Sequence, residues 1–147
     1  MSGTTVYTDG ACLGNPGPGG WAWAVPGGRW RNGPAAATTN QRMEIMAALD
    51  AARTIDGPLE VVSDSTYVVN CFRDGWWKGW LTRGWVGSAK QKVANRDLWE
   101  SLFALVLDGE RLVTFCWVKG HSGDRWNDVV DLLAVEAATT GRGTAGP

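Results

Sequence analysis

Short apolar runs alternate along this chain with longer stretches of helix-forming residues, a pattern typical of an α/β domain. Residues 4–9, 20–25 and 28–32 predict three strands. The first run has little polar alternation, which predicts a central strand covered on both faces. Pro26-Gly27-Gly28 is a turn signal between the other two, so we expect them to form a hairpin.

The rest of the chain predicts four helices and two more strands. The expected helices are residues 41–54, 66–72, 97–107 and 127–138, and the expected strands are residues 59–62 and 112–118. The unit from the first strand through the first helix to the fourth strand has the length of a right-handed crossover, so its two strands should be parallel. We predict one α/β domain, residues 1–138, with a five-stranded mixed sheet in which three antiparallel strands lead into two parallel ones, flanked by helices. Residues 139–147, rich in Gly, Thr and Ala, are expected to be a disordered tail.

The composition is that of an ordinary globular protein and limits the classes of function. The 147 residues are 44% hydrophobic and 20% charged, and the net charge of −1 gives the molecule no strong overall field. There is no apolar run of about 18 residues and no signal-peptide pattern, so no membrane association is expected. Three cysteines without C-x-x-C spacing favour reduced thiols in a cytoplasmic protein over disulfides or a zinc site. We expect a monomer with no obligate protein partner.

Four carboxylates fall where the predicted elements would bring them together. Asp9 and Asp64 each follow a strand of the parallel pair, and the carboxyl ends of parallel strands meet at one edge of a sheet. Glu44 lies about one turn into the first helix, and Asp131 lies on the last helix. Such a cluster is costly unless a cation neutralises it, and oxygen ligands favour Mg²⁺ or Mn²⁺ over zinc. Taken singly, however, Asp9 and Asp64 also suit turns, and Asp131 suits a solvated helix face.

Residues 73–96, which we call the handle, combine basic and aromatic side chains. The handle holds six cationic residues and one acid. Its tryptophans are Trp76, Trp77, Trp80 and Trp85. Cations neutralise phosphates and aromatic rings stack on bases, which favours a contact with nucleic acid. A helical excursion whose tryptophans pack on one another explains the same pattern, and we expect both to hold.

His121, the one histidine of the chain, lies between Gly120 and Ser122-Gly123, ahead of the last helix. A lone histidine is more often structural than functional. Flexible glycines around a ring that titrates near neutral pH suit a proton shuttle, so we retain His121 as a candidate for proton transfer.

Taken together, these features resemble ribonuclease H of the type 1, bacterial-type family. In family order, the matching segments are Tyr7-Thr8-Asp9-Gly10, Gly14-Asn15-Pro16-Gly17, Thr38-Thr39-Asn40-Gln41-Arg42-Met43-Glu44, Ser63-Asp64-Ser65 with Tyr67-Val68, Asp97-Leu98-Trp99, Trp117-Val118-Lys119-Gly120-His121-Ser122-Gly123, and Asn127 through Asp131 to Ala134. They extend over residues 4–138. The resemblance implies a ribonuclease H-like fold and hydrolysis of the RNA strand of RNA–DNA hybrids by two-metal-ion catalysis, giving 5′-phosphate and 3′-hydroxyl ends.

The resemblance also implies roles for individual residues. The carboxylates that would bind two Mg²⁺ ions, or Mn²⁺ as a substitute, are Asp9, Glu44, Asp64 and Asp131. His121 would assist proton transfer or product release. The residues implied for contact with the RNA strand are Cys12, Asn15, Asn40 and Gln41, and Gly10 and Arg42 join the substrate-binding set. Those implied for the DNA strand are Thr39 and Asn95 at a phosphate, Tyr67, Trp76 and Ser88 in a channel, and Lys90 and Lys92 on the handle.

Three departures from the family pattern affect these expectations. The segment from Asp64 to Trp76 is one residue longer, Ala37 replaces an arginine that some relatives have, and Asp128-Val129 replaces a Glu-Arg pair. Two other functions remain open at this point. One is a resolvase or integrase of the same fold, which the handle argues against. The other is a non-catalytic module that binds hybrids or double-stranded RNA, which four carboxylates facing phosphates argue against.

Overall fold

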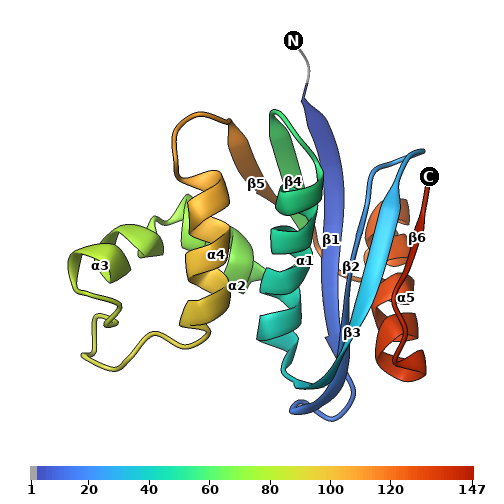
Figure 1. Cartoon of the computed structure of the whole chain (residues 1–147), viewed down its shortest axis with the longest axis horizontal. Coiled ribbons are helices and arrows are strands. Elements are labelled where there is room, and N and C mark those ends of the chain that lie inside the picture. Colours follow the sequence, from blue (N-terminus) through green and yellow to red (C-terminus); the bar gives the residue numbers. More distant parts are fainter. Residues whose placement is uncertain (1–2) are drawn as a thin grey trace.

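The computed structural model describes residues 3–147, and a six-stranded mixed sheet lies at its centre (Figure 1). The strand order is β5-β4-β1-β2-β3-β6. The strands are β1 (Thr4–Cys12), β2 (Gly17–Ala24), β3 (Trp30–Thr38), β4 (Leu59–Ser63), β5 (Val113–Trp117) and β6 (Thr144–Gly146). The helices are α1 (Asn40–Thr54), α2 (Thr66–Arg73), α3 (Trp76–Thr82), α4 (Arg96–Val106) and α5 (Arg125–Thr140). Because β1, β2 and β3 pair antiparallel while β4 and β5 continue the sheet in parallel, the predicted mixed α/β fold is confirmed.

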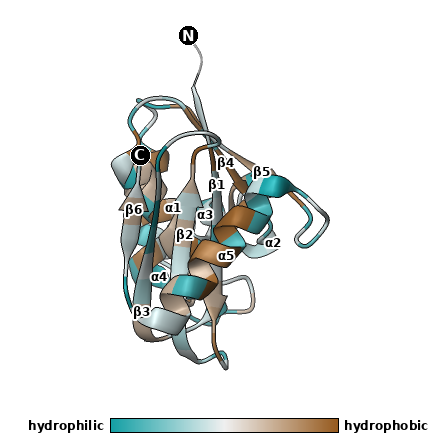
Figure 2. Cartoon of the chain, turned by 90° about the vertical axis from the view of Figure 1, so that its right-hand side faces the viewer, coloured by the Kyte–Doolittle hydropathy of each residue, from teal (hydrophilic) through white to brown (hydrophobic). Residues whose placement is uncertain are grey.

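Helices cover both faces of the sheet. α1 packs on β1 and β2 and against α4, and α5 crosses the opposite face over β1, β2 and β3 (Figure 2). The alternation along β2 explains these two layers. Trp21 and Trp23 join the larger core beneath α1, whereas Ala22 and Ala24 meet Val130 of α5. Within residues 3–147, no helix combines the length and the apolar character that crossing a membrane requires.

The C-terminal residues differ from the predicted disordered tail. α5 continues to Thr140, and β6 pairs antiparallel with β3, which makes six strands where five were predicted. The anchor is Asn32, which is 2% exposed. Its Oδ1 accepts hydrogen bonds from the backbone N–H and the hydroxyl of Thr144, both at 2.7 Å, and its amide donates to the carbonyl of Leu133 at 2.8 Å. These bonds satisfy a buried polar side chain and so offset the entropy of ordering a glycine-rich segment.

Two strands run further than the sequence predicts. β1 continues past Asp9 to Cys12, because its antiparallel pairing with β2 extends beyond its parallel pairing with β4, which ends at Thr8. β3 continues through Pro34 to Thr38. An edge position tolerates this proline, since β6 pairs only with the first residues of β3 and no partner needs the missing N–H.

Candidate active site

Three carboxylates meet where the parallel pairing of β1 and β4 ends. Asp9 comes one residue after the last parallel pair on β1, and Asp64 follows β4 directly. Glu44 reaches them from α1. One ligand oxygen of each residue lies within 4.8 Å of those of the other two, and we call these three residues the acidic cluster. The structure thus brings together three of the four carboxylates that the sequence analysis grouped.

The sequence around Gly10 and Thr39 explains how α1 delivers Glu44. A Cβ at Gly10 would lie 2.5 Å from the backbone nitrogen of Glu44 and from the carbonyl carbon of Met43, closer than packing allows. Only glycine therefore lets α1 lie this close to β1. Thr39 fixes the start of the helix, since its side chain accepts a hydrogen bond from the N–H of Arg42 at 3.2 Å.

Burial controls the protonation of the acidic cluster. Asp9 is 4% exposed, and desolvation raises its pKa strongly, with the charges of Glu44 and Asp64 adding to the shift. Desolvation also raises the pKa of Glu44, and the charge of Asp64 raises it further, while a hydrogen bond with Asp9 opposes the shift. Without a cation, the coupled pair therefore retains at least one proton at neutral pH.

A divalent cation fits this cluster. Oε1 of Glu44 is buried without a hydrogen-bond partner, and in the described part of the chain only Oγ1 of Thr38 shares that condition. A buried polar atom left unsatisfied costs about 1–3 kcal/mol. A cation would satisfy this oxygen and replace the retained proton. Because all the available ligands are carboxylate oxygens, the site suits a hard ion such as Mg²⁺ or Mn²⁺.

Asp131 and His121 stand apart from the acidic cluster. Asp131 is not among the carboxylates of residues 3–147 whose oxygens lie within 4.8 Å of one another. It is half-buried on α5, one turn after Asn127, whose side chain contacts Asp64. Residues four apart share a helix face, so Asp131 lies on the side of α5 that leads to the cluster. His121 is exposed in the loop between β5 and α5, at a φ of 55°.

The residues implied for RNA contact surround the turn between β1 and β2 and the start of α1. The Sγ of Cys12 lies 3.4 Å from each of two backbone carbonyl oxygens. Oδ1 of Asn15 accepts a hydrogen bond from the backbone N–H of Asn40 at 3.0 Å. This bond joins the glycine-rich loop to the first residue of α1. Asn15, Asn40 and Gln41 are therefore exposed on one surface. We call these three residues and Cys12 the rim.

Arg42 links α1 to α4. Its guanidinium donates two hydrogen bonds to the carboxylate of Asp97, at 2.7 and 3.0 Å, and one to Oδ1 of Asn95 at 3.4 Å. The hydrogen bonds from Arg42 hold the pKa of Asp97 below its usual value. The amide of Asn95 donates in turn to the hydroxyl of Tyr67 at 3.1 Å. Thr39, Arg42, Asn95 and Tyr67 thus form one connected strip, which runs from the start of α1 to α2.

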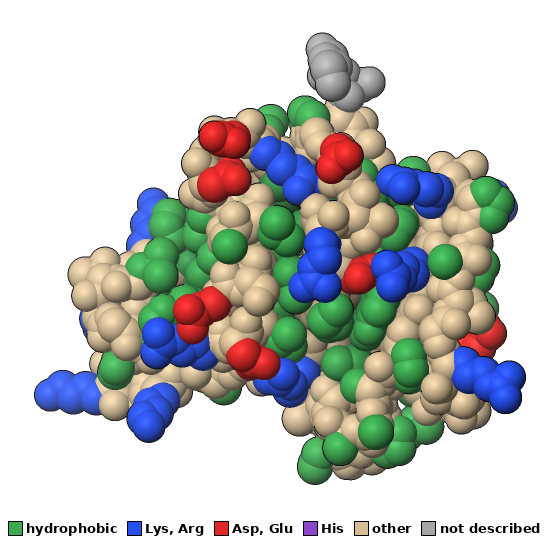
Figure 3. Space-filling model, viewed as in Figure 1, with side chains coloured by type: hydrophobic (Ala, Val, Ile, Leu, Met, Phe, Trp, Pro, Cys, Tyr) green, Lys and Arg blue, Asp and Glu red, His purple; other side chains and the backbone are tan. Residues whose placement is uncertain are grey.

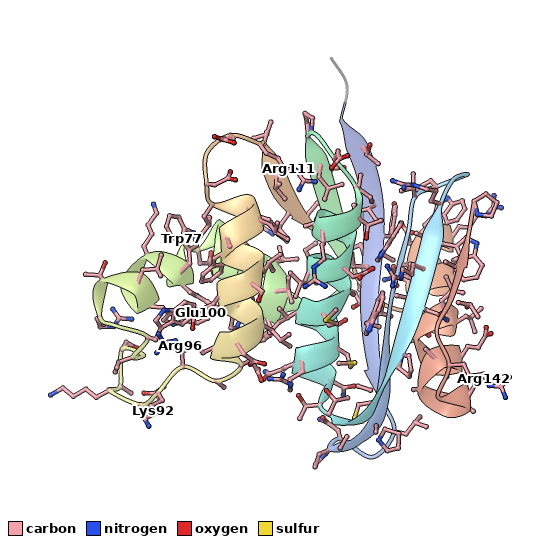
Figure 4. The ribbon with its side chains drawn as sticks, in the orientation of Figure 1. Trp77, Lys92, Arg96, Glu100, Arg111 and Arg142 are labelled. Carbon is pink, nitrogen blue, oxygen red and sulfur yellow. The ribbon has the colours of Figure 1, made fainter. Side chains whose placement is uncertain are left out.

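The tryptophans of the handle pack against one core but are buried to different extents. Trp85 is 8% exposed and stacks on Phe103 of α4, with ring centroids 5.5 Å apart. A hollow of about 310 Å³ beside it is lined by Trp76, Trp80, Arg83, Gly87, Ser88 and Gln91. Lys90 and Lys92 are exposed on the outer loop, where Figure 4 shows Lys92 at the periphery. Figure 3 shows Lys and Arg side chains at this end and also across the rest of the same face.

Two residues that the sequence analysis did not select contact Asp64. The side chain of Asn127 donates to its carboxylate, and the indole N–H of Trp117 donates to its backbone carbonyl. Asn127 is 2% exposed and occupies the same helix face as the buried Val130 and Ala134. A polar side chain at an apolar position of α5 is the sequence signal that would have found it.

The comparisons with known proteins agree with this geometry. The family model described as RNase H matches residues 1–139. A ribonuclease H of Syntrophomonas wolfei is 46% identical over 143 residues, covering 93% of this chain and 97% of that protein. A ribonuclease HI of Xylella fastidiosa is 43% identical over 152 residues, covering 98% and 97%. The crystal structure of LC9-RNase H1, a type 1 RNase H with the type 2 active-site motif, gives a TM-score of 0.78 at 29% identity, covering 99% of this chain and 79% of that chain. The chain therefore belongs to the ribonuclease H family, the endoribonucleases that act on RNA–DNA hybrids.

Proposed function

We propose that this chain hydrolyses the RNA strand of RNA–DNA hybrids, leaving 5′-phosphate and 3′-hydroxyl ends, and that Asp9, Glu44, Asp64 and Asp131 bind two Mg²⁺ ions. The acidic cluster is the observation that carries the proposal: three carboxylates converge, and one of them has a buried oxygen without a partner. A module that only binds nucleic acid gains nothing from carboxylates facing phosphates. Catalysis explains the cluster, because ions held there would stabilise the attacking and leaving oxygens of an in-line displacement.

The residues in and around the cluster would bind the ions, orient the carboxylates and transfer a proton. Asp9 lies on the central strand β1, between β4 and β2, so it would be the carboxylate shared by two ions. The N–H of Gly10 donates to Oδ1 of Asp9 at 2.9 Å and orients that carboxylate. Asp131 completes the set from the α5 side. His121, exposed on a loop between glycines, carries a proton between the site and solvent.

The surfaces beside the cluster match the two strands of a hybrid. The rim offers amide groups that can donate to and accept from ribose 2′-hydroxyls, the feature that distinguishes RNA from DNA. The strip and the exposed lysines of the handle lead away from it and suit the phosphates of the DNA strand. The handle and the Asn40-Gln41 pair favour this function over that of a resolvase or integrase. The protein would act as a monomer, and its three free cysteines suit the reducing cytoplasm.

Incubation with labelled substrates tests the proposal. The substrates are an RNA–DNA hybrid, double-stranded RNA, single-stranded RNA and a DNA four-way junction, each with Mg²⁺ or with EDTA. We expect cleavage only of the RNA strand of the hybrid, and only with Mg²⁺. Cleavage of the junction would favour a resolvase, and binding of the hybrid without cleavage would favour the non-catalytic module.

Single substitutions then test the carboxylates. We expect Asp64→Asn to lower the cleavage rate by more than about 100-fold, since even residues that only support a metal ligand are worth about 10–100-fold. Asp131→Asn should cost less, because Asp131 lies outside the acidic cluster. Glu136→Gln, on an exposed position of α5, serves as the matched control. Cleavage by Asp64→Asn at the wild-type rate would refute the proposed mechanism.

A further inference from the structure

The backbone of Asp64 is fixed by the end of β5. The N–H of Val118 donates to the carbonyl of Ser63 at 3.0 Å, which extends the pairing of β4 and β5 to the residue before Asp64. The indole N–H of Trp117 then donates to the carbonyl oxygen of Asp64 itself, at 3.1 Å. These two bonds hold the main chain on both sides of the Cα that carries the carboxylate.

The carboxylate of Asp64 is confined on two further sides. The side-chain amide of Asn127 donates to its Oδ2 at 3.3 Å. A Cβ on Gly120 would lie 2.7 Å from the same oxygen, so the backbone of Gly120 packs directly against the carboxylate. Asn127 is held in turn by Asp124, the N-cap of α5, which accepts a hydrogen bond from its backbone N–H at 3.0 Å.

We propose that Asn127 is a positioning residue for Asp64 and that Gly120 shapes the same contact. This inference rests on the proposed metal site. Together the two residues orient Oδ2, so that the carboxylate presents its free lone pairs toward the other members of the acidic cluster. Metal-ligating carboxylates are commonly held by such hydrogen bonds, and losing the partner lowers metal affinity.

The chemistry of an amide suits this place. Nδ2 of asparagine donates a hydrogen bond without bringing a charge. A lysine would supply a cation that competes with the metal, and an aspartate would add a further negative charge to a cluster that already raises the pKa values of Asp9 and Glu44. Asn127 is also 2% exposed, so in the intact protein solvent does not compete with Asp64 for its side-chain amide.

Titration of the substrate-free protein with Mg²⁺ alone, followed by isothermal calorimetry, tests the inference. We expect Asn127→Ala to weaken Mg²⁺ binding by about 10–100-fold. Gly120→Ala acts on the same oxygen from the other side and should weaken binding in the same sense. Glu136→Gln, exposed on the same helix, should leave the affinity unchanged.

Kinetics and melting separate positioning from a structural role. For Asn127→Ala we expect kcat to fall at fixed Mg²⁺ and to recover as Mg²⁺ is raised, with KM for the hybrid within about twofold of wild type. Mg²⁺ affinity equal to wild type in folded Asn127→Ala, with only the melting temperature in EDTA lowered, would overturn the inference. If Asn127→Ala does not fold, wild-type Mg²⁺ affinity in Gly120→Ala overturns it instead. Failure of the wild-type protein to bind Mg²⁺ would refute the metal site itself.

Discussion

Replacing Asp9 with Asn should stabilise the metal-free protein while abolishing cleavage. In the folded protein, burial and the charges of Glu44 and Asp64 raise the pKa of Asp9 far above its ordinary value of 3.8. In the unfolded chain, the same group ionises near that ordinary value. Between the two pKa values the folded state binds more protons than the unfolded state, so the free energy of unfolding falls as pH rises. Asparagine does not ionise and escapes this penalty.

The size of the effect follows from the pKa of Asp9. At pH 7 the ordinary pKa of 3.8 lies about three units below the pH, and each unit corresponds to about 1.4 kcal/mol. Keeping the proton on Asp9 therefore costs up to about 4 kcal/mol. Glu44 shares the retained proton and the structure relaxes, so we expect Asp9→Asn to gain about 1–3 kcal/mol. For a domain of this size the gain corresponds to a rise in Tm of about 3–10 °C.

Thermal unfolding in EDTA at pH 5, 7 and 8.5, followed by circular dichroism, measures this gain. The difference between Asp9→Asn and wild type should grow with pH. It should shrink when Mg²⁺ saturates the wild-type protein, because only a protein that binds the ion gains stability from it. Asp56→Asn, at an exposed acid, is the control and should show no such trend. A difference that is absent, or constant across pH, would refute the reasoning that ionisation of the buried Asp9 destabilises the metal-free fold.

Three further predictions concern the handle and the tail. Neutralising Lys90 and Lys92 should raise KM and reduce the salt dependence of log KM by about 0.7–0.9 per lysine, with kcat little changed; an unchanged KM would move substrate binding elsewhere. Trp85→Ala should lower the free energy of unfolding by about 3–5 kcal/mol in denaturant titrations, because Trp85 is buried against α4. The same substitution at the half-buried Trp77 should lower it less, and equal losses would contradict this difference in burial. Deleting residues 141–147 should cost about 1–3 kcal/mol through the lost partners of the β3 anchor and leave the cleavage rate unchanged; a loss of cleavage would give the tail a role at the active site.

The convergence of Asp9 and Asp64 could be predicted because it depends on local rules. A crossover of this length joins parallel strands, and parallel strands carry the residues at their ends to one edge. The chemistry of Glu44 was equally visible, since a carboxylate among Met, Ala and Ile residues of a helix needs a reason to be there. The types of the side chains and the periodicity of the sequence pattern were sufficient to predict that these three residues belong to one site.

The tail could not be predicted in the same way because its partner is distant in sequence. Thr144 is held by Asn32, 112 residues earlier, and nothing in the composition of residues 139–147 reveals that contact. The full length of β1 depends on where β2 pairs with it, which is again a property of two segments together. Local composition describes the entropy of a segment but not the bonds that offset it.

Several features around the acidic cluster each reduce stability, and most of them concern groups that could hold a cation. Gly10 lies within a strand, where glycine costs about 0.5–1 kcal/mol relative to alanine. Asp9 is buried and shares with Glu44 a proton that the unfolded chain would release, and Glu44 has a buried oxygen without a partner. Asn127 places a polar amide at a core position. Within residues 3–147, the only hydrogen bond of its side chain is the one to Asp64. A purely structural account would favour apolar side chains in place of Asp9, Glu44 and Asn127, whereas Gly10 is required for the close approach of α1 to β1. Because the costs converge on one point, where oxygen ligands face one another, they support the proposed ion site.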